Sequence, residues 1–361
     1  MGYTAPDFSL PLFAEAPVAR TQPAPNDGVL PPHFFSTTNL PTYLKNTNGT
    51  WSLPTEPRMD GCIVQTDTGW TVREPRRVLA GDPIVVGHAE DGSEGIFVHT
   101  AGFNATSQKA DNFRFMSSPV SREKPIDYRS IAKLLIEQRR HGGYVVWVCG
   151  PALVHSRARD NLVWFIRNSF VQALLAGNAV AVHDIEAAIV GTTLGMCSDG
   201  SATAGGHSAH MRAINTVRAC GSIEAAVHSD VIHSGIMHAC VIEQVPTVLC
   251  GSIRDDGPLP GVITDSIESQ NAMRAHTVQA TMVVMIASAL HSIAVGNMLP
   301  AYYQDPHKGL VELPTLCVDA SEFIVSKLKD RGTHQAIGIV TNAQDFMSIL
   351  RASVEQLILQ S

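Results

Sequence analysis

The run Tyr144-Val-Val-Trp-Val-Cys149 is continuously apolar or aromatic and is too short for a typical helix. A strand covered on both faces has this composition, and such strands are typical of parallel sheets. Five further runs of the same kind follow along the chain: Ala179–His183, Thr247–Gly251, Met282–Ala287, Leu316–Val318 and Ala336–Val340. Together the runs predict a parallel sheet that is buried on both sides.

Amphipathic stretches separate these runs, and their period predicts helices. The expected helices are Arg159–Leu175, which Gly177 closes, Met211–Cys220 and Glu322–Lys329. One more helix, Ile126–Arg140, is expected just before the first run. Strands that alternate with helices indicate an α/β domain with right-handed crossovers.

The N-terminal part of the chain has a different texture. Short β-type runs such as Gly61-Cys-Ile-Val-Gln65 and Pro83-Ile-Val-Val-Gly87 lie between turn signals, which predicts a small antiparallel or barrel-like domain. Residues 1–25 are rich in Pro and Ala and are expected to form a flexible or draped arm. We therefore expect an arm (1–25), a small β-rich domain (26–118) and an α/β domain (119–361).

Composition limits the class of protein. A chain of 361 residues suggests two domains, and 45% hydrophobic residues describe an ordinary globular protein. The formal net charge of −7 argues against nonspecific binding to nucleic acid, which needs a basic surface. We expect small molecules and other copies of the chain as partners.

Targeting signals and cysteine usage favour a cytoplasmic protein. The seven cysteines are an odd number without CxxC spacing, which fits a reducing compartment better than a disulfide framework. The N-terminus lacks the basic and apolar regions of a signal peptide. Met282–Leu299 is uncharged and long enough to raise the question of a membrane span, but it contains His291 and Asn297. We expect it to form a buried strand that runs into a loop and a short helix.

Polar residues and glycines are concentrated just after the apolar runs. Ligands of open parallel sheets bind at the carboxyl ends of the strands, in the loops that follow them. The segments at this edge are Gly150–His155, Asp184–Glu186, Ser252–Pro260, His291–Pro300, Asp319 and Thr341-Asn342. Their composition predicts a ligand-binding edge.

Asp319 ends a predicted strand, where a carboxylate can accept both ribose hydroxyls of an adenine nucleotide. It can equally be the N-cap of the helix that follows. No GxGxxG motif follows the first strand, so a pyrophosphate would need other backbone amides. Those of Gly177–Ala179 or Gly296–Leu299 are suitable, since small residues allow close approach and helix N-termini carry partial positive charge.

The most polar loop holds Arg254, Asp255 and Asp256. Arg254 can bind a substrate carboxylate with two parallel hydrogen bonds, and an aspartate can take an ammonium group or a ribose hydroxyl. Two adjacent aspartates can also supply a base. The alternative is a turn that is held together by an Arg–Asp contact and stiffened by Pro and Gly.

Three other chemistries have weaker support. His207 and His210 are three positions apart with no Glu between them, so we expect no metal site. The chain has no GxSxG motif, which argues against a serine hydrolase. Cys149 stands at a strand end and can be imagined as a nucleophile, but a buried thiol is the commoner state.

Several long motifs resemble the archaeal-type ornithine cyclodeaminase family, which shares a conserved region with lysine-ketoglutarate reductase/saccharopine dehydrogenase. The resemblance runs from about Asp27 to Phe346. Its motifs include Asp27-Gly-Val-Leu-Pro31, Phe35-Ser-Thr-Thr-Asn-Leu-Pro-Thr-Tyr43, Arg58-Met-Asp60, Gly177-Asn-Ala-Val-Ala-Val-His-Asp-Ile-Glu186, Met211-Arg-Ala-Ile-Asn215, Gly251-Ser-Ile-Arg-Asp-Asp-Gly-Pro-Leu-Pro260 and His291-Ser-Ile-Ala-Val-Gly-Asn-Met-Leu-Pro300.

The resemblance implies a Rossmann-like, deoxyhypusine synthase-like parallel sheet, which binds NAD, behind a small N-terminal β-rich domain. It also implies conversion of L-ornithine to L-proline and ammonia through a transient hydride transfer to bound NAD, and a homo-oligomer (tetramer or dimer). The segment that carries the covalent lysine of deoxyhypusine synthase has no counterpart here, so aminobutyl transfer to a protein is not expected.

The resemblance also assigns roles to residues. With the chemistry of the loops taken into account, the candidate catalytic residues are Arg254, Asp255, Asp256, His183 and Asp184. The implied substrate-binding residues are Thr38, Asn39, Arg58, His210 and Arg212. The implied cofactor-binding residues are Asn178, Ala179, Asp256 (or Asp255), Asn297, Met298, Leu299, Pro300, Asp319, Thr341 and Asn342.

Two alternatives remain at this point. One is an NAD-dependent oxidoreductase or lyase that acts on another amino acid or a polyamine. The other is a noncatalytic nucleotide-binding or assembly protein that kept the fold.

Overall fold

The computed structural model describes residues 3–103, 126–197, 201, 203, 206–255, 257–300, 302–305, 308–329 and 336–360. The chain forms two compact units. The β-rich unit comprises residues 1–124, 297–313 and 332–335, and the α/β unit comprises 125–296, 314–331 and 336–361. The chain therefore returns to the β-rich unit after the α/β unit has begun, whereas our division of the sequence assumed a single crossing near residue 118.

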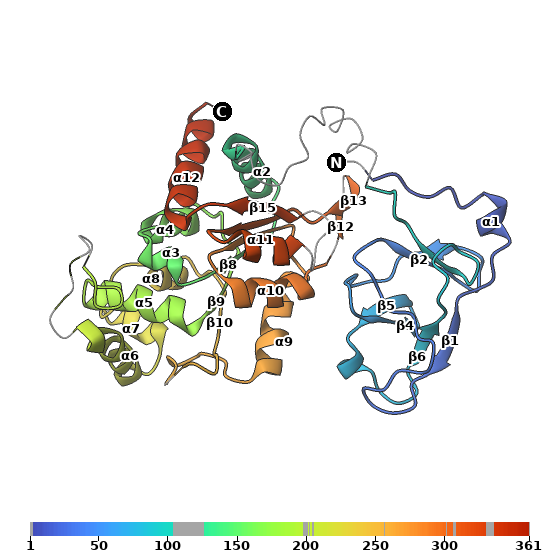
Figure 1. Ribbon diagram of the computed structural model, residues 1–361, viewed down its shortest axis with the longest axis horizontal. Helices are drawn as coiled ribbons and strands as arrows, with labels where there is room; N and C mark the ends of the chain where they lie inside the picture. Colours follow the sequence, from blue (N-terminus) through green and yellow to red (C-terminus); the bar gives the residue numbers. More distant parts are fainter. Residues whose placement is uncertain are drawn as a thin grey trace. The chain divides into compact units, whose positions relative to one another are not determined.

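The α/β unit is built on a six-stranded sheet in which every neighbouring pair is parallel (Figure 1). Its strands are β8 (Val145–Cys149), β9 (Ala173–Gly177), β10 (Thr247–Cys250), β11 (Met282–Ile286), β14 (Thr315–Asp319) and β15 (Ala336–Val340). The spatial order is β10-β9-β8-β11-β14-β15. In chain order within the unit this is 3-2-1-4-5-6, the doubly wound order of Rossmann folds, which confirms the predicted fold class.

The strands are continuously apolar because both faces of the sheet are covered. Every residue of β8, β9 and β11 is buried. Alternate strand residues such as Trp147, Val284 and Val318 share one core with the helices of one layer. Residues of opposite parity such as Val146 and Met285 are equally buried and face the other layer.

The first layer holds α2 (Tyr128–Arg140), α3 (Ala152–His155), α4 (Arg159–Arg167), α5 (Asn178–Ile189), α6 (Ala209–Cys220), α7 (Ile223–His228), α8 (Ile236–Ile242) and α12 (Ala343–Leu359). The second layer holds α9 (Ser266–Thr277), α10 (Ala289–Met298) and α11 (Glu322–Lys329). α9 contacts β10, and α11 contacts β14 and β15. α2 and α12 lie side by side in the first layer (Figure 1).

Two predictions about elements were wrong. The run Ala179–His183 is not a strand but part of α5, and the expected helix Arg159–Leu175 ends at Arg167, with β9 taking its last residues. α5 is buried around most of its circumference, including Val180, Ala181 and Val182. A helix without a polar face shows no helical period, so its sequence cannot be told from that of a buried strand.

The β-rich unit contains three small antiparallel sheets, ordered β1-β6-β4-β5, β3-β2-β7 and β12-β13. Its elements are α1 (Pro11–Ala14), β1 (Arg20–Pro23), β2 (Thr42–Lys45), β3 (Trp51–Ser52), β4 (Cys62–Thr66), β5 (Gly69–Arg73), η1 (Pro75–Arg77), β6 (Pro83–Val86), β7 (Ile96–Val98), β12 (Tyr302–Asp305) and β13 (Gly309–Glu312). The structure confirms the predicted small β-rich domain.

The N-terminal arm is draped over this unit. β1 pairs with β6, and the ring of Phe8 stacks on Trp51 with centroids 5.2 Å apart. The buried Lys45 ammonium donates hydrogen bonds to the carbonyls of Phe13, Ala14 and Ala16, at 2.7 to 3.0 Å. These contacts hold the arm in place, so of the two expectations for it the draped form applies.

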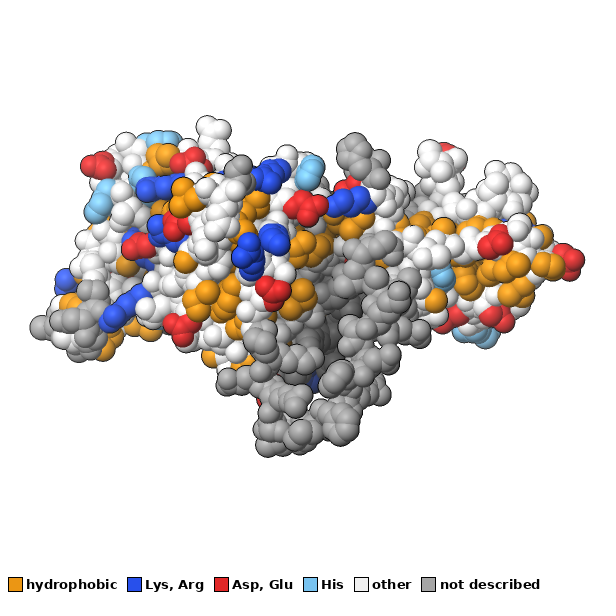
Figure 2. Space-filling model, turned by 90° about the horizontal axis from the view of Figure 1, so that it is seen from above, with side chains coloured by type: hydrophobic (Ala, Val, Ile, Leu, Met, Phe, Trp, Pro, Cys, Tyr) orange, Lys and Arg blue, Asp and Glu red, His pale blue; other side chains and the backbone are white. Residues whose placement is uncertain are grey.

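Met282–Leu299 divides into the buried strand β11 and the helix α10, close to the expected strand followed by a short helix. Within the described residues, no helix combines the length and apolarity needed to cross a membrane. On the face in Figure 2, Lys and Arg side chains are interspersed with Asp and Glu rather than gathered in one basic patch.

Candidate functional site

The strand order reverses between β8 and β11, and the loops that leave these two strands touch. Gly150 follows β8 and donates its amide hydrogen to the carbonyl of Ile286 at 2.9 Å. A Cβ atom on Gly150 would lie 1.6 Å from the carbonyl oxygen of Ala287, so only glycine fits. Ala287 itself has a φ of 55°, a strained conformation for a residue with a side chain. Ligands of doubly wound sheets bind beside this reversal.

The N-terminus of α5 lies at the carboxyl end of β9, the strand next to β8. Gly177 is its N-cap and supplies no side-chain hydrogen bond, so the first-turn amides lack a side-chain cap. Asn178 is buried, and its Oδ1 accepts a hydrogen bond from the amide of Leu259 at 3.1 Å. Asn178 therefore fixes the loop after β10 against this helix start, while Ala179 is half-buried.

His291 of α10 stands over the same helix start. A Cβ atom on Gly177 would lie 2.6 Å from Cε1 of the His291 ring. Burial lowers the pKa of His291, Arg254 lowers it further, and Asp255 opposes the shift. The imidazole is therefore neutral near pH 7 and can accept a proton.

The loop after β10 carries the Arg254 and Asp255 of the sequence analysis. Arg254 is exposed, and Oδ2 of Asp255 accepts a hydrogen bond from the amide of Ser252 at 2.7 Å. Asp256 lies outside the described residues. Arg254 and Asp255 lie close enough to His291 to shift its pKa, and His291 stands over the start of α5. The loop after β10, α5 and α10 therefore form one group.

Asp319 and Thr341 form a second group, at the ends of the neighbouring strands β14 and β15. The amide of Thr341 donates to the carbonyl of Asp319 at 3.0 Å. Oδ1 of Asp319 accepts from the amide of Ser321 at 2.9 Å, one residue before α11 begins. Asn342 is the N-cap of α12, and its side chain accepts from the amide of Asp345. The Asn342 side chain, an expected cofactor contact, thus caps α12 in this structure.

Asp184 of α5 is fully buried and its carboxylate serves the fold. It pairs with Arg159 at 2.6 Å and accepts the amides of Ile236 and Met237 at the start of α8, at 2.9 and 2.8 Å. Burial raises the pKa of Asp184, and these partners oppose the shift. The described contacts of the Asp184 carboxylate are with Arg159 and two backbone amides of the α/β unit, so this geometry gives no support to a catalytic role.

His183 and His155 are neighbours, although they come from different helices. The two rings lie 4.5 Å apart between centroids. Nδ1 of His183 lies 3.2 Å from Oε2 of Glu186, a fully buried carboxylate. His183 was implied by the resemblance, whereas His155, Glu186 and His291 had only been placed in segments at the binding edge. Glu186 stands three residues after His183 on α5, a spacing that would have paired them had the helix been recognised, whereas His155 reaches His183 only through the packing of α3 on α5.

The expected substrate-binding residues lie in both units. In the β-rich unit, Thr38 and Asn39 are half-buried, and Arg58 is 9% exposed. The guanidinium of Arg58 pairs with the buried Glu74 and donates to the carbonyl of Asn297 at 3.0 Å. Arg58 therefore fixes the segment Asn297–Pro300, in which Met298, Leu299 and Pro300 are buried.

His210 and Arg212, the remaining expected substrate-binding residues, lie on α6. His210 is half-buried and Arg212 is exposed. No described contact links these two side chains to the group around His291. Their proposed role therefore rests on the resemblance alone.

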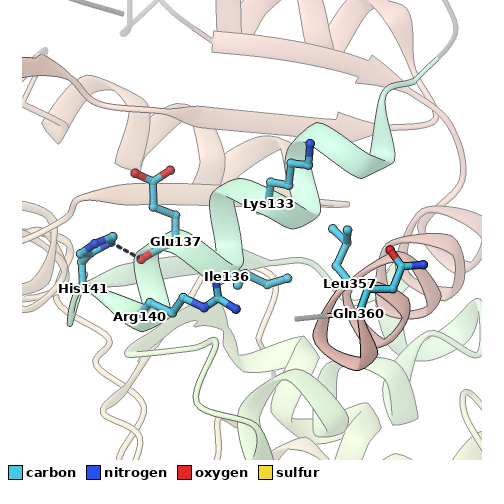
Figure 3. Close-up of a pocket in the computed structure, with 7 residues that line it drawn as sticks. All are labelled: Lys133, Ile136, Glu137, Arg140, His141, Leu357 and Gln360. Atoms are coloured by element: carbon cyan, nitrogen blue, oxygen red, sulfur yellow. Dashed lines mark hydrogen bonds between the residues drawn. The ribbon is translucent and has the colours of Figure 1, made fainter.

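A surface groove of about 480 Å³ lies between α2 and α12 and is lined by Lys133, Ile136, Glu137, Arg140, His141, Leu357 and Gln360 (Figure 3). α2 ends just before β8 begins, and α12 runs back from the end of β15. The groove is thus at the amino edge of the sheet, opposite the edge at which doubly wound folds bind ligands.

Two other sites from the sequence analysis can be placed. Cys149 is buried, and burial raises the pKa of its thiol, so it is poorly suited to act as a nucleophile. Among the described residues, no three His, Cys, Asp or Glu side chains are arranged to hold a metal ion.

The sheet order defines the class as a Rossmann-type α/β protein, and the polar groups at the carboxyl ends of β8, β9 and β10 form its candidate ligand site. The sequence matches two parts of one family: residues 129–350 match "Arginine dihydrolase ArgZ-like, C-terminal, Rossmann fold", and residues 41–129 match its "C-terminal, first region". The chain belongs to this ArgZ-like C-terminal family.

Archaeal relatives match most of the chain. It is 43% identical to the ornithine cyclodeaminase of Methanopyrus kandleri, covering 91% of this chain and 76% of that protein. It is 42% identical to that of Methanothermobacter thermautotrophicus, covering 96% and 81%. A crystal structure of a conserved LOR/SDH protein from Methanococcus maripaludis covers 95% of this chain and 99% of its own, with a TM-score of 0.85 and 39% identity.

A cyanobacterial relative is longer than this chain. The bifunctional arginine dihydrolase/ornithine cyclodeaminase AgrE of Nostoc is 38% identical, covering 94% of this chain and 47% of AgrE. A ternary complex of AgrE with ornithine and NAD⁺ has a TM-score of 0.61 and 36% identity, covering 98% of this chain and 48% of that one.

Proposed function

We propose that this chain is an NAD-dependent ornithine cyclodeaminase that converts L-ornithine to L-proline and ammonia. The observation that carries the proposal is 40 to 43% identity, over 91% or more of the chain, to five archaeal ornithine cyclodeaminases. The AgrE complex with ornithine and NAD⁺ supports the same substrate and cofactor.

NAD fits the carboxyl edge of the α/β unit. α5 offers first-turn amides without a side-chain cap, and its first residues, Asn178 and Ala179, leave room for close approach because Ala179 is small. These amides would hold the pyrophosphate in place of a GxGxxG loop. Asp319 and Thr341 stand together on the other side of the reversal and would hold the adenine ribose. We also propose Asn297–Pro300 as cofactor contacts, on the resemblance alone.

The reaction breaks the bond between Cα and the α-amino nitrogen of ornithine and makes a bond between Cα and the δ-nitrogen. NAD, when bound, would supply an acceptor for the Cα hydride and the source of its return, so the overall change would be redox-neutral. The chain must therefore bind the carboxylate, orient two amines and move protons between them.

Arg254 and His291 are the residues that we propose for these tasks. The exposed guanidinium of Arg254 can bind the substrate carboxylate. The neutral imidazole of His291 can accept a proton from a substrate ammonium group, which frees the amine to react. Asp255 would hold the second ammonium, and Thr38 and Asn39 remain proposed substrate contacts of the β-rich unit.

Two further expectations belong to the proposal. We place the protein in the cytoplasm, where its seven free cysteines stay reduced. We also propose a homo-oligomer, a tetramer or a dimer, because the resemblance implies one.

Incubation of the purified chain with NAD⁺ and L-ornithine tests the proposal. We expect proline and ammonia in equal amounts, with no accumulation of NADH. An amino-acid dehydrogenase would instead accumulate NADH in step with its product. A chain that forms neither product, and that neither retains nor binds NAD, would exclude both.

A further inference from the structure

Glu186 is a charged side chain in the interior of the α/β unit. It is fully buried, and four groups meet its carboxylate: Nδ1 of His183 at 3.2 Å, the Thr192 hydroxyl at 2.9 Å, the Leu194 amide at 3.1 Å and the Gly195 amide at 3.0 Å. Burial alone would raise the pKa of Glu186, but these hydrogen bonds together hold it below its usual value. The side chain is therefore an ionised carboxylate.

This charge determines the tautomer of His183. An ionised carboxylate can only accept hydrogen bonds, because neither of its oxygens carries a hydrogen. Nδ1 of His183 must therefore carry the hydrogen that it shares with Glu186. In the neutral form of the ring, Nε2 is then the nitrogen without hydrogen and can accept a proton. The Asp of a Ser-His-Asp triad orients its histidine in the same way.

His155 completes the group from α3. Its ring lies 4.5 Å from that of His183, at an angle of 59°. Its Nδ1 is buried and has no hydrogen-bond partner among the described residues. Burial, and then the neighbouring His183, lower the pKa of His155, so the His155 ring is neutral near pH 7. Buried polar atoms without a partner are rare, so Nδ1 of His155 calls for an explanation beyond packing, and a role in catalysis is one.

The group is carried by two helices that leave the carboxyl edge of the sheet. α3 begins three residues after the end of β8, and α5 begins directly after the end of β9. These two strands are neighbours, and both helices leave them at the carboxyl edge. Asn178, the proposed cofactor contact, and His183 are on the same helix, α5.

We infer that Glu186 is the positioning residue of the His155–His183 pair, and that it holds His183 as the Nδ1–H tautomer so that Nε2 can take a proton from a substrate amino group. The proton passes from the ammonium nitrogen to Nε2, which leaves a neutral amine, and it returns to the departing ammonia. The role in the reaction rests on the proposed function, whereas the tautomer can be measured without it.

The test combines nuclear magnetic resonance with kinetics on the full chain. Protein labelled with ¹⁵N-histidine, with His183→Asn used for assignment, reports which ring nitrogen carries hydrogen. We expect Nδ1–H for His183 in the wild type. Glu186→Gln keeps the size but can turn its NH₂ group toward His183, so we expect Nε2–H there. The same variant should lower kcat for proline formation at least tenfold, with KM within about twofold.

Thr192→Val is the matched control, because it removes a different hydrogen bond to the same carboxylate. It should leave the His183 tautomer unchanged even if it lowers the melting temperature. Nε2–H in the wild type would overturn the inference, with no need for any variant. So would a folded Glu186→Gln protein with wild-type kcat. A wild type that makes no proline contradicts the proposed function instead, and the spectra still decide whether Glu186 sets the tautomer.

Discussion

Asp184 and Glu186 are two positions apart on α5 and both are fully buried, yet they serve different elements. Asp184 joins α4 and α8 through Arg159 and two amides, while Glu186 joins His183 to the loop that follows α5. The resemblance implied a catalytic role for Asp184. The contacts of the two side chains assign the structural task to Asp184 and the positioning task to Glu186.

Replacing Asp184 with Ala should destabilise the protein strongly. It leaves Arg159 with a buried charge and the two α8 amides without an acceptor, a loss of about 3–5 kcal/mol. The measurement is the free energy of unfolding in denaturant. Asp160→Ala is the control, because Asp160 is 89% exposed and lies 3.9 Å from the same Arg159, and it should change little. Equal stability of the two variants would contradict the structural role.

Gly150 allows the two loops at the strand reversal to touch. Gly150→Ala should cost about 1–3 kcal/mol or more in unfolding free energy, because its Cβ would meet the Ala287 carbonyl oxygen at 1.6 Å. Gly251→Ala is the control after β10, since its nearest neighbours would lie at an ordinary 3.4 Å. Thermal unfolding of both variants checks the prediction. A Gly150→Ala protein as stable as the wild type would show that the loops can separate at little cost.

The raised pKa of Glu312, on β13, should make the stability of the protein depend on pH. Burial raises its pKa from 4.5 to about 7, so the folded protein holds a proton that the unfolded chain releases. The stability that this proton gives is complete below pH 4.5 and is lost as the pH rises to about 7. Glu312→Gln should therefore match the wild type near pH 4.5 and melt at a higher temperature at pH 8. A constant difference across this range would contradict the raised pKa.

At the level of helices and strands, an element was predictable where the composition of its sequence fitted only one kind of element. β11 and β15 were expected within one residue of their observed ends, and α11 was expected with its observed ends. β9 and α5 were not, because both are buried on nearly every side and α5 shows no exposed polar face that would tell a helix from a strand. The correction matters for function, since it puts Asn178 and Ala179 at a helix N-terminus rather than in a strand.

The proposed binding of a pyrophosphate at the N-terminus of α5 can be tested by adding a negative charge there. Ala179→Glu should favour the helix but repel a bound pyrophosphate, since both negative charges compete for the same amides. Ala179→Gln has nearly the same size without the charge and is the matched control. NAD⁺ should bind the Glu variant about tenfold more weakly than the Gln variant at low salt, with a smaller difference at high salt. Calorimetric titration of both checks this. Equal affinities would place the pyrophosphate elsewhere.

At the scale of the whole molecule, the sequence predicted both fold types but not how the chain divides between them. The apolar runs and the turn-rich N-terminal part predicted the parallel sheet and the small β domain. The return of residues 297–313 to the β-rich unit was not foreseen, because β12 and β13 have ordinary strand patterns that do not say which core they join. The contact of His155 with His183, and the position of His291 over Gly177, likewise depend on packing between distant segments. Only folding brings such side chains together.

The central claim is that one molecule of NAD takes the Cα hydride of ornithine and gives it back within the same turnover. L-Ornithine with deuterium at Cα tests this most directly, with mass spectrometry of the proline that forms in ordinary water. We expect proline that keeps the deuterium at Cα, with no build-up of NADH. Proline with only solvent hydrogen at Cα, or the absence of proline beside accumulating NADH, would contradict it.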